Sequence, residues 1–242
     1  MDMVDPLPAE MAGYDPFELL DAESDRVDRF YRSLRGDAWL APTRCADWNR
    51  FQLLSHLASI EDYTRAGLTE TVAELMSGAP SSGMDEFNEW GVDQRSDLPP
   101  EDLLVEWRRL STENRRALRE KGVDATLDTA VGPYPLGRQA FYLASELAIH
   151  GDDAGAETPE EEQAARQEWR VRFARAAIAE VGRGVSVEVR DGGQVVRLGS
   201  DEAFLDDATL VEAASGRLAA GARLADGGQL PPALHKALVA LA

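Results

Sequence analysis

Apolar residues recur at helical spacing in four segments of the first 150 residues, and this pattern most constrains the fold of the 242-residue chain. The segments cover residues 15–36, 49–78, 99–122 and about 137–150. Each carries an apolar stripe, so each must bury that face against a neighbour. We expect the four helices to close as a bundle, and the interior of a bundle often holds a metal site built from facing helices.

Start and stop signals accompany these segments. Asp15 and Pro16 have the chemistry of an N-cap followed by a first-turn proline. Gly122 and Gly151 follow the third and fourth segments, where a glycine often ends a helix. The pattern therefore predicts that the fourth helix ends at Gly151.

The sequence changes character near residues 152–160. Thr158 and Pro159 predict the start of a linking helix. Valines then alternate with polar residues over 185–196, on either side of a turn at 191–193, which is typical of a β-hairpin.

A helix near residues 207–220 and a short one from Pro231 are expected to close the chain. We predict a mainly α protein in which residues 1–155 form the bundle and residues 156–242 form a small α+β domain.

A formal net charge of −19 argues against nucleic acid or an anionic membrane as a partner, because both would be repelled. No apolar run approaches the roughly 18 residues of a membrane span, and the acidic first residues do not resemble a secretory signal. We therefore expect a cytoplasmic protein. The scarcity of lysine, with only Lys121 and Lys236, indicates a high-GC bacterial genome.

Glu146 and His150 stand four residues apart in an otherwise apolar segment, so both side chains project from one helix face. His56, on the second segment, is a candidate third ligand. Two imidazoles and a carboxylate around Zn²⁺ leave the fourth position open, as in catalytic zinc sites. The same spacing also suits a surface ion pair without metal, and the single cysteine, Cys45, excludes a cysteine-rich zinc site.

The other polar residues near these positions have weaker signals. Asp153, three residues after His150, either accepts a hydrogen bond from the free imidazole N–H or is an ordinary acid at a helix end. His235 has no carboxylate nearby in sequence and is interpreted as incidental. Nothing beside Cys45 ensures a lowered thiol pKa, so an idle cysteine is the usual reading there.

Two stretches of the sequence resemble a known family. These are "WLAPTRCADWNRFQLLSHLASIEDY", with two tryptophans, Pro-Thr and a helix bearing "HL", and "ELAIHGDDAG", with Glu, three residues, His, Gly, any residue and Asp. They are similar to the mycothiol-dependent maleylpyruvate isomerase-like family, whose N-terminal part is a DinB-type four-helix bundle. The resemblance implies a divalent metal, usually zinc, held by His56, Glu146 and His150.

The resemblance also implies a cofactor and a reaction class. Characterised members use the thiol mycothiol, either as a cofactor for cis–trans isomerisation or as a transferred nucleophile, with a small electrophile as substrate. A metal-bound thiol loses its proton well below the pKa of about 8.5 of a free thiol, so the protein need not supply its own sulfur. The family's late "GR" dipeptide corresponds to Arg217, which is expected to pair with a substrate carboxylate; a solvated arginine at a helix end is the other reading.

Two alternatives to a thiol-dependent enzyme stay open. One is a metal-containing bundle without catalysis, acting as a binding or regulatory protein. The other is a bundle without metal, in which Glu146 and His150 simply pair.

Overall fold

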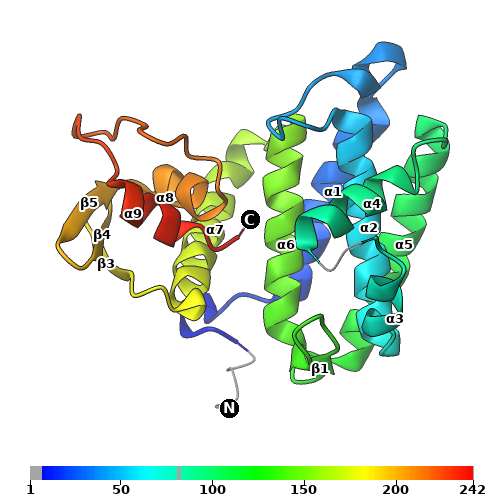
Figure 1. The fold of residues 1–242 in the computed structure, drawn as a ribbon, viewed down its shortest axis with the longest axis horizontal. Coiled ribbons are helices and arrows are strands. Elements are labelled where there is room, and N and C mark those ends of the chain that lie inside the picture. The colour runs from blue at the N-terminus through cyan, green and yellow to red at the C-terminus, as the bar shows by residue number, and fades with distance from the viewer. Residues whose placement is uncertain (1–6, 81–82, 242) are drawn as a thin grey trace. The chain divides into compact units, whose positions relative to one another are not determined.

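The computed structural model describes residues 7–80 and 83–241, which form two compact units. One unit contains residues 15–157, and the other combines residues 7–14 with residues 158–241 (Figure 1). The N-terminal segment 7–14 thus packs with the C-terminal part of the chain, a feature that the sequence pattern does not reveal. Within the described residues, no helix has the length and apolar character needed to cross a membrane.

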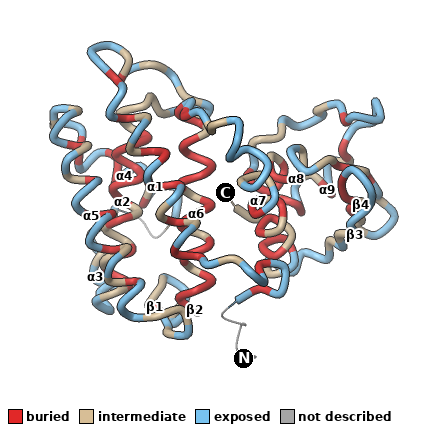
Figure 2. The backbone as a smooth tube through the Cα atoms, turned by 180° about the vertical axis from the view of Figure 1, so that it is seen from behind, coloured by how far each residue is buried: buried red, intermediate tan, exposed pale blue. Residues whose placement is uncertain are grey.

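The first unit is built on four long helices. They are α1 (Pro16–Ser33), α2 (Arg50–Thr69), α5 (Pro100–Lys121) and α6 (Leu136–Ala154). α1 packs on α5 and α6, while α2 packs on α5 and α6. α6 is buried over most of its length, as Figure 2 shows, because the other helices cover it.

Local signals fix where the bundle helices begin. The Asp15 carboxylate accepts a hydrogen bond from the backbone N–H of Phe17, as an N-cap does. Asn49 and Gln52 form a reciprocal capping box at the start of α2. These caps satisfy backbone donors that have no partner within the helix.

The predicted second helix is wrong in its length. The chain leaves α2 at Glu70, which has φ 59°, and resumes in the short helix α3 (Val72–Ser77). A further helix, α4 (Met84–Asp93), packs on α2 in a region where the sequence pattern predicts none. The short 3₁₀ helix η2 (Gly36–Leu40) also packs on α2, and a two-stranded ladder of β1 (Thr126–Leu127) and β2 (Tyr134–Pro135) precedes α6.

The predicted end of the fourth helix at Gly151 is also wrong. α6 continues to Ala154, and Gly155 ends it in the left-handed conformation. Gly151 instead allows a close approach: a Cβ at this position would lie 2.5 Å from a guanidinium nitrogen of Arg26 on α1. Arg26 donates to the backbone oxygen of Ala148 within α6 and to that of Ala156, two residues beyond the helix, so it ties the end of α6 to the segment that follows.

The second unit is a small α+β assembly. The short 3₁₀ helix η1 (Ala9–Met11) packs on α7 (Glu160–Val181). Three antiparallel strands follow in the order β3 (Ser186–Arg190), β4 (Gly193–Leu198) and β5 (Asp201–Leu205). The sequence predicts the hairpin of β3 and β4, in which Val187 pairs with Val196, but not the third strand.

Two short helices complete this unit, α8 (Asp207–Ala214) and α9 (Pro232–Leu238). α8 is shorter than the predicted helix over 207–220. Its N-cap is Asp206, which accepts a hydrogen bond from the N–H of Thr209. Residues of the helices and the sheet share one apolar core, which includes Ile178, Val196, Leu205, Leu210 and Leu234.

Candidate metal centre

The three predicted ligands lie together inside the bundle. His56 projects from α2, whereas Glu146 and His150 project from one face of α6. Glu146 Oε1 lies 3.2 Å from His56 Nε2 and 3.2 Å from His150 Nε2. The ligand atoms of all three residues lie within 4.8 Å of one another. Spacing along α6 and packing of α2 on α6 therefore direct three donor atoms to one point.

The donor set fits a divalent ion. Zn²⁺ binds imidazole nitrogen and carboxylate oxygen at about 2.0–2.1 Å, and atoms at that distance from a tetrahedral ion lie about 3.3 Å apart. The separations of 3.2 Å from Glu146 Oε1 to the two Nε2 atoms are close to this value. His56, Glu146 and His150 would be the ligands of such an ion.

The site is more open at its carboxylate than at its imidazoles. The side chains of His56 and His150 are 3% and 8% exposed, whereas that of Glu146 is 29% exposed. The two imidazoles are buried and lie beside Glu146, whose side chain is the only one of the three that is partly exposed to solvent.

The two titratable groups on α6 shift each other's pKa. Burial opposes ionisation of Glu146, but hydrogen bonds and positive charge from His150 and His56 outweigh it and hold its pKa below the usual range. Burial alone would lower the pKa of His150, yet hydrogen bonds with Asp153, Cys45 and Glu146 raise it well above 6.5. The cluster thus keeps a carboxylate ionised inside the protein, as a metal ligand must be.

Asp153 and Cys45 occupy the other edge of the His150 ring. Asp153 Oδ2 lies 3.2 Å from His150 Nδ1, and the Cys45 thiol donates to the same oxygen at 3.2 Å. Cys45 Sγ is also 3.7 Å from His150 Nδ1. A backbone hydrogen bond from Arg44 to the carbonyl of Asp153 joins the Cys45 loop to the end of α6. Of the two sequence readings of Asp153, the geometry agrees with a partner of the imidazole.

Trp48 has a position that sequence reasoning did not assign. Its ring is tilted 32° from that of His56, with 4.7 Å between the centroids. Its indole nitrogen donates to Glu89 on α4, and its carbonyl accepts from the Thr43 hydroxyl. Trp48 therefore supports one face of the His56 ring. Its place in the tryptophan-rich motif before the "HL" helix was the available signal.

The remaining candidates lie in the C-terminal unit. Arg217 follows α8, and its guanidinium donates to the carbonyl of Ser215 at 3.0 Å. Its role with a substrate stays a prediction. His235 Nε2 is 2.8 Å from the carbonyl of Leu218, a contact within the same unit.

Comparisons with known proteins place the chain in a family. The model of the mycothiol maleylpyruvate isomerase N-terminal domain matches residues 20–155, more than half of the chain. Among curated proteins, no sequence matches the chain.

A solved structure shares the fold. It is the crystal structure of a histidine-to-alanine mutant of the mycothiol-dependent maleylpyruvate isomerase, with a TM-score of 0.61 and 17% identity over 96% of this chain and 99% of that chain. The predicted fold class, a DinB-like bundle followed by a small α+β part, is confirmed. The chain belongs to the family defined by the mycothiol maleylpyruvate isomerase N-terminal domain.

Proposed function

We propose that the protein is a metal-dependent enzyme that uses the thiol mycothiol to act on a small electrophile. The reaction is a cis–trans isomerisation of the maleylpyruvate type or an S-transfer from the same thiol. The convergence of His56, Glu146 and His150 on one point, more exposed at Glu146, carries this proposal. Membership of the family and the activity named for the structural relative support it.

A bound zinc or similar divalent ion would supply Lewis acidity, which would lower the pKa of a bound thiol from about 8.5 toward neutrality. The chain's own residues hold the ion and orient the ligand rings. Asp153 accepts a hydrogen bond from the Nδ1–H of His150, which leaves Nε2 as the atom that would bind the ion. Trp48 covers a face of the His56 ring and keeps it from turning.

Glu146 acts as a ligand in this proposal and not as a general base. In the HExxH pattern the glutamate stands next to the first histidine and stays free to deprotonate water. Here Glu146 precedes His150 by four residues, and its Oε1 faces both Nε2 atoms. A Glu146→Gln variant should therefore lose metal affinity and activity together.

The thiol chemistry is balanced without an oxidant or reductant. The thiolate sulfur adds to a carbon–carbon double bond conjugated with a carbonyl, and the former double bond can then rotate. Breaking the carbon–sulfur bond returns the thiol and gives the trans isomer. In the S-transferase variant the adduct takes up a proton instead and leaves as a thiol conjugate.

Arg217 is the proposed partner of a substrate carboxylate, since a guanidinium can make two parallel hydrogen bonds to it. In the Arg217→Ala variant we expect unchanged metal content and a raised KM, because the residue belongs to a different unit from the ligands.

Calorimetric titration of mycothiol into zinc-loaded and metal-free protein tests the proposed function. We expect binding only to the loaded form, weaker binding of thiols that lack the sugar part, and thiol-dependent conversion of a cis-configured unsaturated keto acid to its trans isomer or its thiol adduct. Equal binding to both forms, or no binding of any thiol to loaded protein, would favour a bundle that holds metal without catalysis.

A further inference from the structure

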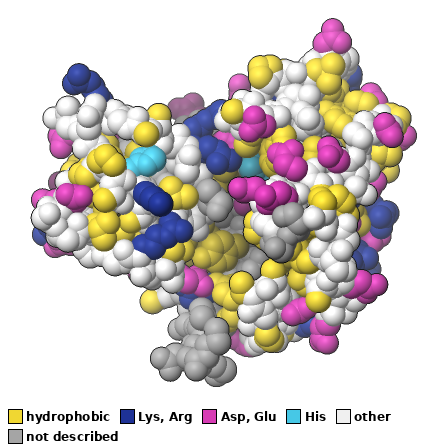
Figure 3. Space-filling model, viewed as in Figure 1, with side chains coloured by type: hydrophobic (Ala, Val, Ile, Leu, Met, Phe, Trp, Pro, Cys, Tyr) yellow, Lys and Arg dark blue, Asp and Glu magenta, His cyan; other side chains and the backbone are white. Residues whose placement is uncertain are grey.

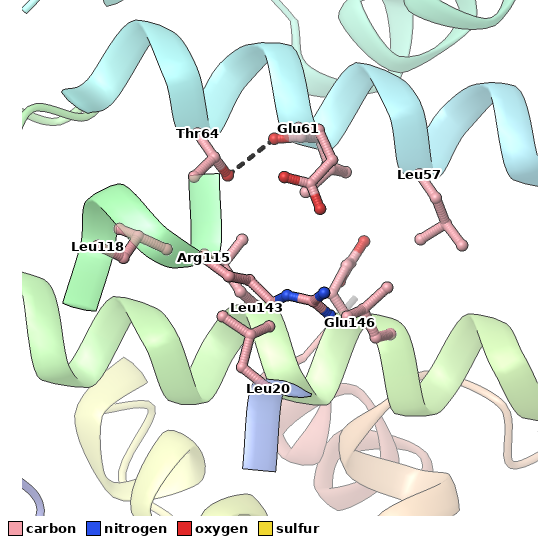
Figure 4. A pocket seen from close by; sticks show the side chains of 10 residues that line it. Leu20, Leu57, Glu61, Thr64, Arg115, Leu118, Leu143 and Glu146 are labelled. Atoms are coloured by element: carbon pink, nitrogen blue, oxygen red, sulfur yellow. Dashed lines mark hydrogen bonds between the residues drawn. The ribbon is translucent and has the colours of Figure 1, made fainter. Parts of the chain in front are cut away.

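A small cavity lies inside the bundle beside Glu146. Its walls are apolar side chains of α1, α2, α5 and α6, together with Glu61, Thr64, Arg115 and Glu146. Figure 4 shows the Arg115 guanidinium and the carboxyl groups of Glu61 and Glu146 directed toward the same space. The cavity measures about 10 Å³, which is the room that one water molecule needs.

Arg115 brings an unsatisfied donor to this cavity. Its Nε is 3.2 Å from Asp21 Oδ1, and its side chain is 17% exposed. Its Nη1 is buried and has no hydrogen-bond partner within residues 7–80 and 83–241. A buried charged donor without a partner is costly, and native proteins usually satisfy such groups with ordered water.

Glu61 supplies a fixed acceptor on the opposite wall. Its Oε2 accepts from Asn114 Nδ2 at 2.8 Å, which holds the carboxyl group in place. Burial raises the pKa of Glu61, although hydrogen bonds from Asn114 and Ser111 and the charge of Arg115 oppose the rise. The cavity therefore offers one water molecule a cationic donor and two carboxyl groups, enough partners to hold it.

We propose that Arg115 is a positioning residue for Glu146 and acts through one water molecule held in this cavity. Nη1 donates to the water, and the water donates to the carboxyl groups of Glu146 and Glu61. The inference rests on the proposed function in one respect, that Glu146 is a metal ligand. Outer partners fix the orientation of ligating carboxylates, and their removal typically weakens metal binding by about 10- to 100-fold.

Arg119 provides a matched control. It lies one turn after Arg115 on α5, and its Nη2 is 2.7 Å from the other oxygen of Asp21. Its guanidinium packs over the Phe17 ring, and it lies outside the described lining of the cavity. Replacing Arg119 removes the same charge and one contact with the same carboxylate without reaching Glu146.

The test measures zinc affinity by competition with a chelator and the visible spectrum of Co²⁺-loaded protein, which reports ligand geometry. We expect Arg115→Met to weaken zinc binding by about 10- to 100-fold and to shift the Co²⁺ bands. Arg119→Met should leave both unchanged. Circular dichroism verifies that each variant is folded, and Arg115→Gln, which also lacks Nη1, gives the same readouts if Arg115→Met does not fold.

The outcomes separate the two proposals. Wild-type zinc affinity and an unchanged Co²⁺ spectrum in the Arg115 variants would overturn the role of Arg115 alone. Equal losses in the Arg115 and Arg119 variants would do the same, since they would indicate a general charge effect. A wild-type protein that binds neither ion would contradict the proposed function and, with it, this inference.

Discussion

His150 has a polar neighbour at each ring nitrogen, and this arrangement decides its chemistry. Nε2 faces Glu146 and His56, while Nδ1 faces Asp153 and Cys45. An acceptor at Nδ1 keeps a proton there, so Nε2 is the nitrogen that would bind an ion once the ion replaces the Nε2 proton. The carboxylate also raises the donor strength of the imidazole.

Asp153→Asn is predicted to weaken zinc affinity by about 10- to 100-fold, because the amide lacks the charge that supports His150. Asp152→Asn is the matched control: the neighbouring carboxylate pairs with Arg26 at 3.2 Å. Affinities from chelator competition decide the comparison. Equal losses in both variants would show that net charge, and not the contact with His150, is responsible.

The raised pKa of Glu61 predicts the sign of a pH dependence of stability. Burial raises the folded-state pKa of its carboxyl above 4.5, and hydrogen bonds from Asn114 and Ser111 only partly offset this. The unfolded carboxyl therefore ionises first as pH rises. As pH rises above the unfolded-state pKa, the contribution of Glu61 to the free energy of unfolding falls. The fall ends once pH exceeds the folded-state pKa.

Glu61→Gln should abolish this fall in stability with rising pH, because the amide oxygen still accepts a hydrogen bond from Asn114 and carries no charge. We expect the variant to gain stability relative to wild type between about pH 5 and about pH 7.5. Urea unfolding at both pH values measures the difference. A difference between the two proteins that does not change with pH would contradict the assignment.

At the scale of elements, α6 carries the site because it continues past Gly151. The final turn from Gly151 to Ala154 places Asp153 beside His150. Arg26 supports this extension, since its guanidinium lies near Gly151 and donates to one carbonyl within α6 and one just beyond its end. A helix that ended at Gly151 would leave His150 without this carboxylate.

Gly151→Ala should destabilise the protein, although alanine is ordinarily the better helix former. The new methyl group would lie 2.5 Å and 3.0 Å from Arg26 atoms, and such overpacking costs about 1–3 kcal/mol. In an Arg26→Ala background the same change should cost less, because the nearest remaining atom, Val27 Cγ2, lies 3.3 Å away. Denaturant unfolding of the four proteins in this cycle measures the coupling. Equal costs in both backgrounds would show that Arg26 is not the obstacle.

Helical periodicity located the long elements but not all of their ends. It predicted α1, α2, α5 and α6 because each buries a continuous stripe. It missed the left-handed turn at Glu70, a non-glycine residue with no sequence signal for positive φ. It also placed a helix end at Gly151. The sequence does not distinguish a glycine that ends a helix from one that leaves room for a neighbouring side chain, here that of Arg26.

Part of the candidate site was open to prediction and part was not. Four-residue spacing placed Glu146 and His150 on one face, and His56 was a candidate third ligand because it lies on the apolar second segment. The resemblance implied the same three residues. The contacts of Cys45 and Arg115 depend on how distant segments pack, so local sequence carried no sign of them. For Glu61 the sequence did hint at buried polar contacts, since a carboxyl group on the inner stripe of α2 must find polar partners.

At the scale of the whole molecule, the acidic surface differs in composition from the candidate metal centre. Asp and Glu side chains are spread over the face shown in Figure 3, in keeping with the net charge of −19. The candidate centre, in contrast, concentrates two of the three histidines of the chain around one carboxylate. Surface acidity suits solubility, whereas the cluster suits a divalent ion.

Metal analysis of protein purified without a histidine tag tests the central claim most directly. We predict close to one equivalent of zinc or a similar divalent ion in the wild type, and none in the His56→Ala/His150→Ala double variant. His235→Ala, which removes the third histidine, should keep the full equivalent. One tightly held equivalent in the double variant, or no metal in the wild type after loading, would contradict the claim.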